Sequence, residues 1–296
     1  MFGVIFRWIA VALVTMLSST VLADEINVES GVYSKTIKRW TVALSHAEFS
    51  STSWLFPTPT EESVDKKHRN GHRDTVLVVS ETAIPDDITI VVWFHGLGGF
   101  SDKTFRQRII PQLNVAAASD DSFVIVIPEM PWSTNTSTPR GRQKQIWKSP
   151  ASLKIFTTII RERLDRWAIE THGKKLETVR WVFVGHSAGG SAITSASREG
   201  SLCELKPELV VWSDASYGSW FEAAWDGCLG SSVIDQHVLV RKWDKPYAQI
   251  REMFKRRFNK EIPFNIYLEV LDRRFWTHGK IGDNVLELAR VFIIGC

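Results

Sequence analysis

The sequence predicts a single α/β domain with a doubly wound, mostly parallel sheet, and three observations support this. From Ile88 onward, short β-rich runs alternate with segments of helical periodicity, the pattern of a parallel sheet covered by helices. The runs are nearly continuous in apolar residues, as expected of strands buried on both faces. The composition, 44% hydrophobic and 23% charged, allows a core of ordinary size.

The expected elements follow from these patterns. Two earlier strands are expected, with a long proline-containing loop or hairpin between them. Loop excursions near residues 130–150 and 215–236 are expected over the site, and neither is long enough for a separate domain. The expected strands are Thr36–Phe49, Thr75–Val79, Ile88–Phe94, Phe123–Ile127, Val179–Val184, Leu209–Trp212, His237–Arg241 and Phe264–Leu271. The expected helices are Asp102–Ala117, Ser152–Glu170, Gly190–Arg198, Pro246–Phe258 and Asp283–Ile293.

The N-terminal 23 residues have the pattern of an export signal. Arg7 precedes a mostly apolar run from Trp8 to Leu17, and Val21-Leu22-Ala23 forms a small-x-small cleavage site. We expect cleavage after Ala23, which leaves residues 24–296 as the single domain; an uncleaved anchor is the alternative. A secreted or periplasmic protein is therefore expected, with no stable membrane association after cleavage. Removing Arg7 takes the net charge from +3 to +2, so no nucleic-acid partner is expected.

The three cysteines are Cys203, Cys228 and Cys296. In an oxidising compartment the first two can pair and leave the third free. Spacing alone does not establish the pairing, which we treat as a hypothesis. None of the three has a metal-ligand spacing, and no metal or cofactor is expected.

The strongest chemical signal is the G-x-S-x-G string around Ser187, which follows a β run and precedes a helix of small residues. A sharp strand-to-helix turn presents its serine at the edge of the sheet. Glycines two residues to either side are needed there, because a Cβ would strike the neighbouring strand or helix. Ser187 is the candidate nucleophile, and an ordinary tight turn is the alternative.

A second motif, His95-Gly96-Leu97-Gly98-Gly99, ends an earlier strand. Acyl transfer needs a second backbone N–H to hold the oxyanion, and a glycine-rich turn supplies it. With these two motifs, the chain over about residues 75–296 resembles the α/β-hydrolase superfamily, in particular its esterases and lipases. The resemblance implies that the backbone amides of Leu97 and Ala188 form the oxyanion hole. It also implies that His95 shapes the loop and is not a base.

The same resemblance implies the chain order nucleophile, acid, histidine. His237 and His278 are the histidines that follow Ser187. His237 opens a predicted strand, where the sheet would hold its ring far from the carboxyl edge. His278 follows the last predicted strand in a loop-like string, so His278 is the candidate general base; a structural or surface role is the alternative.

Three aspartates compete to be the acid that orients the base. Asp214 follows a strand among small and aromatic residues with few charges nearby in the sequence. Asp244 follows the next strand between lysines, in the position that most relatives use, and also suits a helix N-cap before Pro246. Asp272 lies six positions before His278 and suits a turn. We favour Asp214 and keep the other two open.

The segment from Pro128 to Trp147 follows a central strand, so it is expected beside the site. Trp132 is a candidate pocket wall, with Trp147 as an alternative. Arg140 or Arg142 is a candidate fork for a carboxylate or phosphate. The alternative interpretation is a solvated basic loop packed by one tryptophan.

Taken with the resemblance, these motifs favour a carboxylic-ester hydrolase that acts on a small-molecule or acyl substrate through an acyl-enzyme. A peptidase or amidase with the same triad is the alternative, and so is a non-hydrolytic, ligand-binding member of the fold. A likeness of fold does not identify the substrate.

Overall fold

The computed structural model describes residues 51–59, 72–80, 87–96, 123–128, 130 and 150–284. The predicted signal segment, the strand at Thr36–Phe49 and the helix at Asp102–Ala117 lie outside these residues, and so does most of the helix predicted at Asp283–Ile293. The strands are β1 (Ser51–Pro59), β2 (His72–Ser80), β3 (Asp87–Phe94), β4 (Phe123–Pro128), β5 (Thr178–His186), β6 (Leu209–Ser213), β7 (Asp235–Arg241) and β8 (Ile266–Leu271). The helices are α6 (Pro150–His172), α7 (Gly190–Arg198), α8 (Ser201–Glu204), α9 (Trp220–Asp226), α10 (Lys245–Phe258) and α11 (His278–Asp283), with 3₁₀ turns η2 (Ser187–Gly189) and η3 (Leu229–Ser231).

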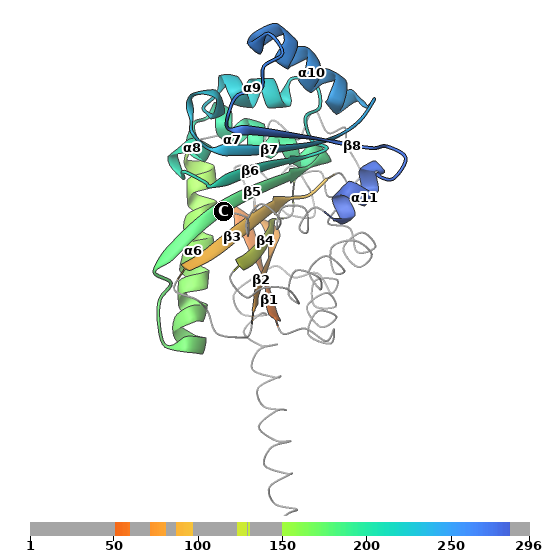
Figure 1. Ribbon diagram of the computed structural model, residues 1–296. Helices are drawn as coiled ribbons and strands as arrows, with labels where there is room; N and C mark the ends of the chain where they lie inside the picture. The colour runs from red at the N-terminus through yellow and green to blue at the C-terminus, as the bar shows by residue number, and fades with distance from the viewer. Residues whose placement is uncertain are drawn as a thin grey trace, which may run out of the picture.

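The described strands form one sheet in the order β1-β2-β4-β3-β5-β6-β7-β8 (Figure 1). The six strands from β4 to β8 in this order are parallel, whereas β2 pairs antiparallel with both β1 and β4. β1 lies in the stretch expected as a loop or hairpin, and β2 contains the strand predicted at Thr75–Val79. The predicted mostly parallel α/β fold is confirmed.

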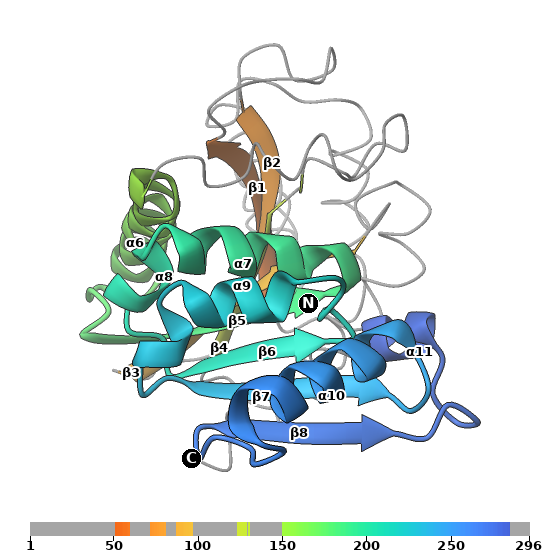
Figure 2. The ribbon, with the colours of Figure 1, turned by 90° about the horizontal axis from the view of Figure 1, so that it is seen from above.

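Both faces of the central sheet are buried, as the continuous apolar runs predict. Along β3, the even-numbered side chains from Ile88 to Phe94 belong to one core cluster with α6, α7, α9 and α10. The alternate side chains point the other way, because successive residues of a strand face opposite sides. Two of them, Val91 and Trp93, are also buried. α6, α7, α9 and α10 therefore pack on one face of the sheet (Figure 2), and side chains on the other face are buried as well.

Three predicted helices are confirmed almost to the residue as α6, α7 and α10. The predicted loop around 215–236 is wrong in part, because α9 lies within it. Phe221 and Ala224 on α9 are buried. The signal that we missed is this pair of apolar residues three positions apart, which is the spacing of one helix face. The last predicted helix also begins differently, since residue 283 ends α11 instead of starting a helix. Among the described residues, no helix combines the length and apolar character needed to span a membrane.

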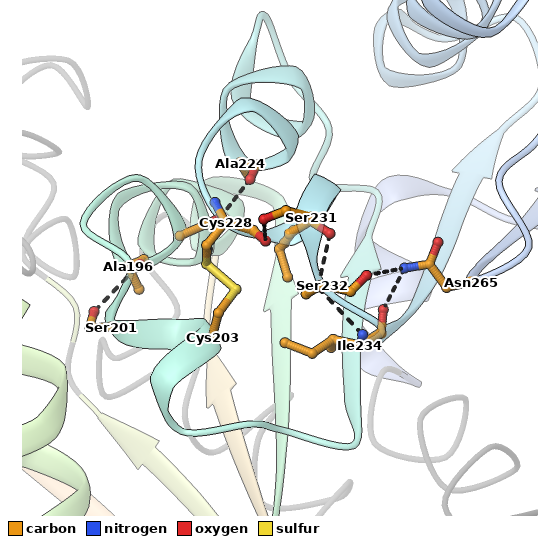
Figure 3. Close-up of a disulfide and its surroundings, with 11 residues drawn as sticks. Ala196, Ser201, Cys203, Ala224, Cys228, Ser231, Ser232, Ile234 and Asn265 are labelled. Carbon is orange, nitrogen blue, oxygen red and sulfur yellow. Dashed lines mark hydrogen bonds between the residues drawn. A yellow bond between two sulfur atoms is a disulfide. The ribbon is translucent and has the colours of Figure 1, made fainter.

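The hypothesised disulfide is present. Cys203 on α8 and Cys228 after α9 are bonded, with Cα atoms 6.0 Å apart (Figure 3). Beside it, the backbone N–H of Cys228 donates to the Ser197 hydroxyl, which in turn donates to the carbonyl of Ala224. The bridge therefore ties α8 to the segment after α9, and the hydrogen bonds of Ser197 tie α7 to α9 and the same segment.

Candidate active site

Ser187 occupies a strained turn between β5 and α7. Its φ of 52° lies in the left-handed region, which a non-glycine residue adopts at a cost and mostly at functional sites. The side chain is half-buried, and α7 begins three residues later. The turn therefore presents the hydroxyl at the carboxyl edge of the sheet, beside the start of a helix.

The glycines around Ser187 are required by close packing, as the sequence predicts. A Cβ at Gly185 would lie 2.7 Å from the Ile193 side chain of α7. A Cβ at Gly189 would lie 2.0 Å from the backbone oxygen of Phe94 on β3. Real Cβ atoms do not approach so closely, so any larger residue would push α7 away from the sheet. These contacts support the turn that holds Ser187.

The register of the parallel strands brings the next candidate to the same edge. His186 on β5 pairs with Ser213 on β6, so Ser187 and Asp214 directly follow paired residues. Asp214 also has a positive φ, 46°, a region in which aspartate is enriched. Its backbone N–H donates to the carbonyl of Leu239 on β7 at 2.8 Å. The turn after β6 is therefore fixed to both neighbouring strands.

Asp214 and His278 are directly hydrogen-bonded. His278 Nδ1 lies 2.6 Å from Asp214 Oδ2, and the Asp214 side chain is 0% exposed. A carboxylate accepts, so Nδ1 carries the proton and donates. This tautomer leaves Nε2 as the acceptor nitrogen of the neutral ring, which is the state that a general base needs.

The His278 ring also contacts two other side chains. The Tyr217 hydroxyl oxygen lies 3.4 Å from Nδ1, and its ring meets the imidazole edge-on. Burial, with the Asp214 carboxylate nearby, raises the pKa of Tyr217 to about 12, so its phenol stays protonated at neutral pH. The imidazole of His186 stacks against the His278 ring with centroids 4.8 Å apart. His278 begins α11, and the hydroxyl of Thr277 caps this helix by accepting from Lys280 N.

The surroundings of Asp214 differ from the uncharged setting that we expected. Arg241, at the end of β7, donates from Nε to the same Oδ2 at 3.1 Å. The chain near Asp214 is uncharged, but the sheet places this arginine beside it from 27 residues away. The uncharged setting for which we favoured Asp214 is therefore absent from the folded structure. Asp214 is nevertheless the aspartate that contacts His278.

The other two candidate acids have different partners. Asp244 lies at the N-cap position of α10, as predicted, but its side chain makes no capping bond and pairs with Arg241 instead. Asp272 is a half-buried residue at the start of a turn, and its carboxylate accepts from Arg274 Nε. The hydrogen bonds from Arg274 lower the pKa of Asp272 to about 2. Both observations weaken these residues as alternatives to Asp214.

The other described histidines of interest have structural environments. His237 is buried within β7, away from the carboxyl edge, with Nε2 3.2 Å from a Glu269 oxygen. Burial lowers its pKa to about 4. His95 accepts from the backbone N–H of Met130 at Nε2, and its Nδ1 lies 2.7 Å from the carbonyl of Gly96. His95 therefore holds the loop after β3, as expected.

Of the remaining candidates, for the oxyanion hole and the substrate pocket, only Ala188 lies among the described residues. Ala188 lies in η2 at the start of the helical segment, where the first N–H groups lack intrahelical acceptors. Leu97, Trp132, Arg140 and Arg142 lie outside the described residues. Within the described ranges, no group of three or more His, Cys, Asp or Glu side chains could hold a metal ion.

Sequence reasoning missed Arg241, Tyr217 and His186 as neighbours of the pair. Each contact depends on which strands are adjacent, and no local pattern marks it. A usable signal for Arg241 was its place at the end of the strand after Asp214, since strand ends of one parallel sheet share an edge.

The sheet order, the strained serine turn after β5 and the acid–histidine pair together define an α/β-hydrolase-like fold. No family model and no curated protein matches the sequence. Several solved structures are similar to this chain. An S-formylglutathione hydrolase of Staphylococcus aureus has 12% identity and a TM-score of 0.46, over 83% of this chain and 98% of that one.

Two further solved structures show a comparable likeness. Esterase B of Lactobacillus rhamnosis has 12% identity and a TM-score of 0.44, over 88% of this chain and 91% of that one. An enterobactin and salmochelin hydrolase has 16% identity and a TM-score of 0.47, over 83% of this chain and 98% of that one.

Proposed function

We propose that the chain is a carboxylic-ester hydrolase with Ser187 as nucleophile, His278 as general base and Asp214 as the acid that orients the base. The observation that carries the proposal is the 2.6 Å bond from His278 Nδ1 to the fully buried Asp214 Oδ2. It occurs at the edge where the register places the strained Ser187 turn. A buried carboxylate on the far nitrogen of an imidazole supports a base directed at a nearby hydroxyl.

The chemistry follows from these groups. His278 Nε2 takes the Ser187 proton as the oxygen attacks the acyl carbonyl, and the imidazolium then protonates the departing alcohol. Water repeats the sequence to release the acid and restore the serine. Asp214 stays ionised and stabilises the imidazolium. The backbone amides of Ala188 and Leu97 are the proposed oxyanion donors.

A fluorophosphonate probe tests the nucleophile, because it phosphonylates an activated serine with loss of fluoride. We expect the probe to label the wild type and Ser219→Ala but not Ser187→Ala. Ser219 is the matched control, since it is an exposed serine at the N-cap of α9 that makes no side-chain capping bond. Ser187→Ala should also lower kcat by roughly 10⁴–10⁶-fold with an unchanged melt. Labelling that persists in Ser187→Ala would refute the assignment.

The substrate class needs a second experiment. The His-Gly-x-Gly-Gly and Gly-x-Ser-x-Gly-Gly motifs favour a small-molecule or acyl ester, and p-nitrophenyl esters of varied acyl length test this. Aminoacyl anilides are the comparison, because an amide needs protonation of a poorer leaving group. Faster turnover of anilides would favour a peptidase. A labelled but inert protein would point to a non-hydrolytic role.

We also propose that the chain is exported, with residues 1–23 removed and residues 24–296 acting as a secreted or periplasmic domain. The Cys203–Cys228 disulfide supports this, because such bonds persist mainly in oxidising compartments.

A further inference from the structure

His186, the last residue of β5, has an environment that the proposed mechanism leaves unexplained. Its side chain is polar, yet the residue is only 7% exposed. The ring lies face to face with the His278 imidazole, with centroids 4.8 Å apart and planes 28° apart. Its Nε2 also lies 3.2 Å from the backbone carbonyl oxygen of His278. One side chain therefore contacts both the ring and the backbone of the proposed base.

The contact with the carbonyl fixes the direction of the hydrogen bond. A carbonyl oxygen only accepts, so His186 Nε2 carries a proton and donates it. The donor belongs to the residue directly before Ser187, and the acceptor belongs to the proposed base. The bond thus joins the residue next to the proposed nucleophile to the proposed base, across 92 residues of sequence.

Two glycines make room for the His186 ring. A Cβ on Gly282 of α11 would lie 2.4 Å from His186 Cε1 and 2.7 Å from Nε2. A Cβ on Gly96, after β3, would lie 3.0 Å from His186 Nδ1 and 3.1 Å from Ser187 Cβ. The ring is therefore in close contact with the loop of the proposed oxyanion hole on one side and with α11 on the other.

The base needs such support because of where it lies. His278 begins a helix of six residues, and its described side-chain hydrogen bonds all involve Nδ1. A bond at Nδ1 holds one end of the imidazole but leaves its plane free to tilt about that bond. Face-to-face contact with a second ring restricts the tilt, and the bond to the carbonyl restricts the backbone.

We propose that His186 is a positioning residue, which holds the plane and the backbone of His278 so that Nε2 faces Ser187, and that Gly282 is glycine so that this ring fits. The proposal rests on the proposed function, because it assigns His186 to the same site. Small misplacements of a catalytic group cost about 10²-fold in rate. We therefore expect His186→Ala to lower kcat by about 10–100-fold while KM changes little.

A double-mutant cycle between Gly282 and His186 separates this role from ordinary core packing. In the wild type, Gly282→Ala should lower kcat by a similar factor, because the new methyl group displaces the His186 ring. In the His186→Ala background the methyl group has space, so Gly282→Ala should cost little more. Equal losses in both backgrounds would show that Gly282 acts elsewhere and would overturn the proposal.

Two conservative variants separate the hydrogen bond of His186 from its ring stack. They also test the positioning role if Gly282→Ala folds poorly. His186→Gln keeps a donor for the His278 carbonyl, whereas His186→Phe keeps the ring stack. Each should restore part of the kcat that His186→Ala loses, at a comparable melting temperature. If His186→Ala keeps wild-type kcat, or if neither variant recovers rate, the inference is wrong. Absent fluorophosphonate labelling of the wild type would instead refute the proposed function itself.

Discussion

The assignment of Asp214 as the acid makes opposite predictions for two neighbouring aspartates. Asp214→Asn removes the charge that orients His278 and stabilises its cation, so kcat should fall by roughly 10⁴-fold. Asp244→Asn removes a partner of Arg241 and leaves the Asp214–His278 hydrogen bond in place, so kcat should stay within a few-fold of wild type. The two substitutions are isosteric and lie at the ends of adjacent strands, so each serves as the control for the other.

The effects on stability can be estimated from burial. Asp214 is fully buried and accepts from Arg241, whose side chain is 19% exposed. Breaking a fully buried pair costs about 3–5 kcal/mol. Because Arg241 is partly solvated and keeps Asp244 as a partner, we expect about 1–3 kcal/mol for Asp214→Asn. Asp244 is 24% exposed, and its loss should cost at most about 1 kcal/mol.

Steady-state kinetics and thermal melts of both variants provide the test. A loss of 1 kcal/mol corresponds to about 2–4 °C for a domain of this size class, so the expected shifts are measurable. A dead Asp244→Asn beside an active Asp214→Asn would refute the assignment. Full activity in both would place the acid elsewhere, and Asp272→Asn would then be the next variant.

Three further predictions concern the rest of the molecule. Replacing Cys203 and Cys228 by serine should lower the free energy of unfolding by about 3 kcal/mol, because the bridge closes a loop with a sequence separation of 25 residues; an unchanged urea midpoint would contradict this. In the folded protein the pKa of His237 is about 4, below the usual 6.5. Between these pH values the unfolded chain binds a proton at His237 and the folded protein does not, so the free energy of unfolding should fall by at most about 3 kcal/mol as pH drops from 6.5 to 4. His237→Gln should flatten that dependence in urea titrations, and an unaltered slope would count against it. The exported chain should begin at Asp24 by intact-mass measurement, and a full-length cytoplasmic chain would refute cleavage.

The sequence alone determined the features that depend on neighbours along the chain. Apolar runs and helical periodicity located β3 to β7, α6, α7 and α10 within a few residues, because burial selects side chains at the local repeat. The glycines around Ser187 were predictable for the same reason, since the tight strand-to-helix turn is itself a local structure. His278 does follow β8, but as the first residue of the short helix α11 and not within a loop as its local string suggested.

The tertiary structure decided everything that depends on which strands are adjacent. Asp214 contacts His278 across 64 residues, and Arg241 joins them from the end of β7. The local string around Asp214 contains no charge, so the arginine was invisible to a reading along the chain. The stack of His186 on His278, the room left by Gly282 and the Cys203–Cys228 bond have the same origin. Sheet order, strand register and the packing of helices α8, α9 and α11 bring these groups together, and all are properties of the folded chain as a whole.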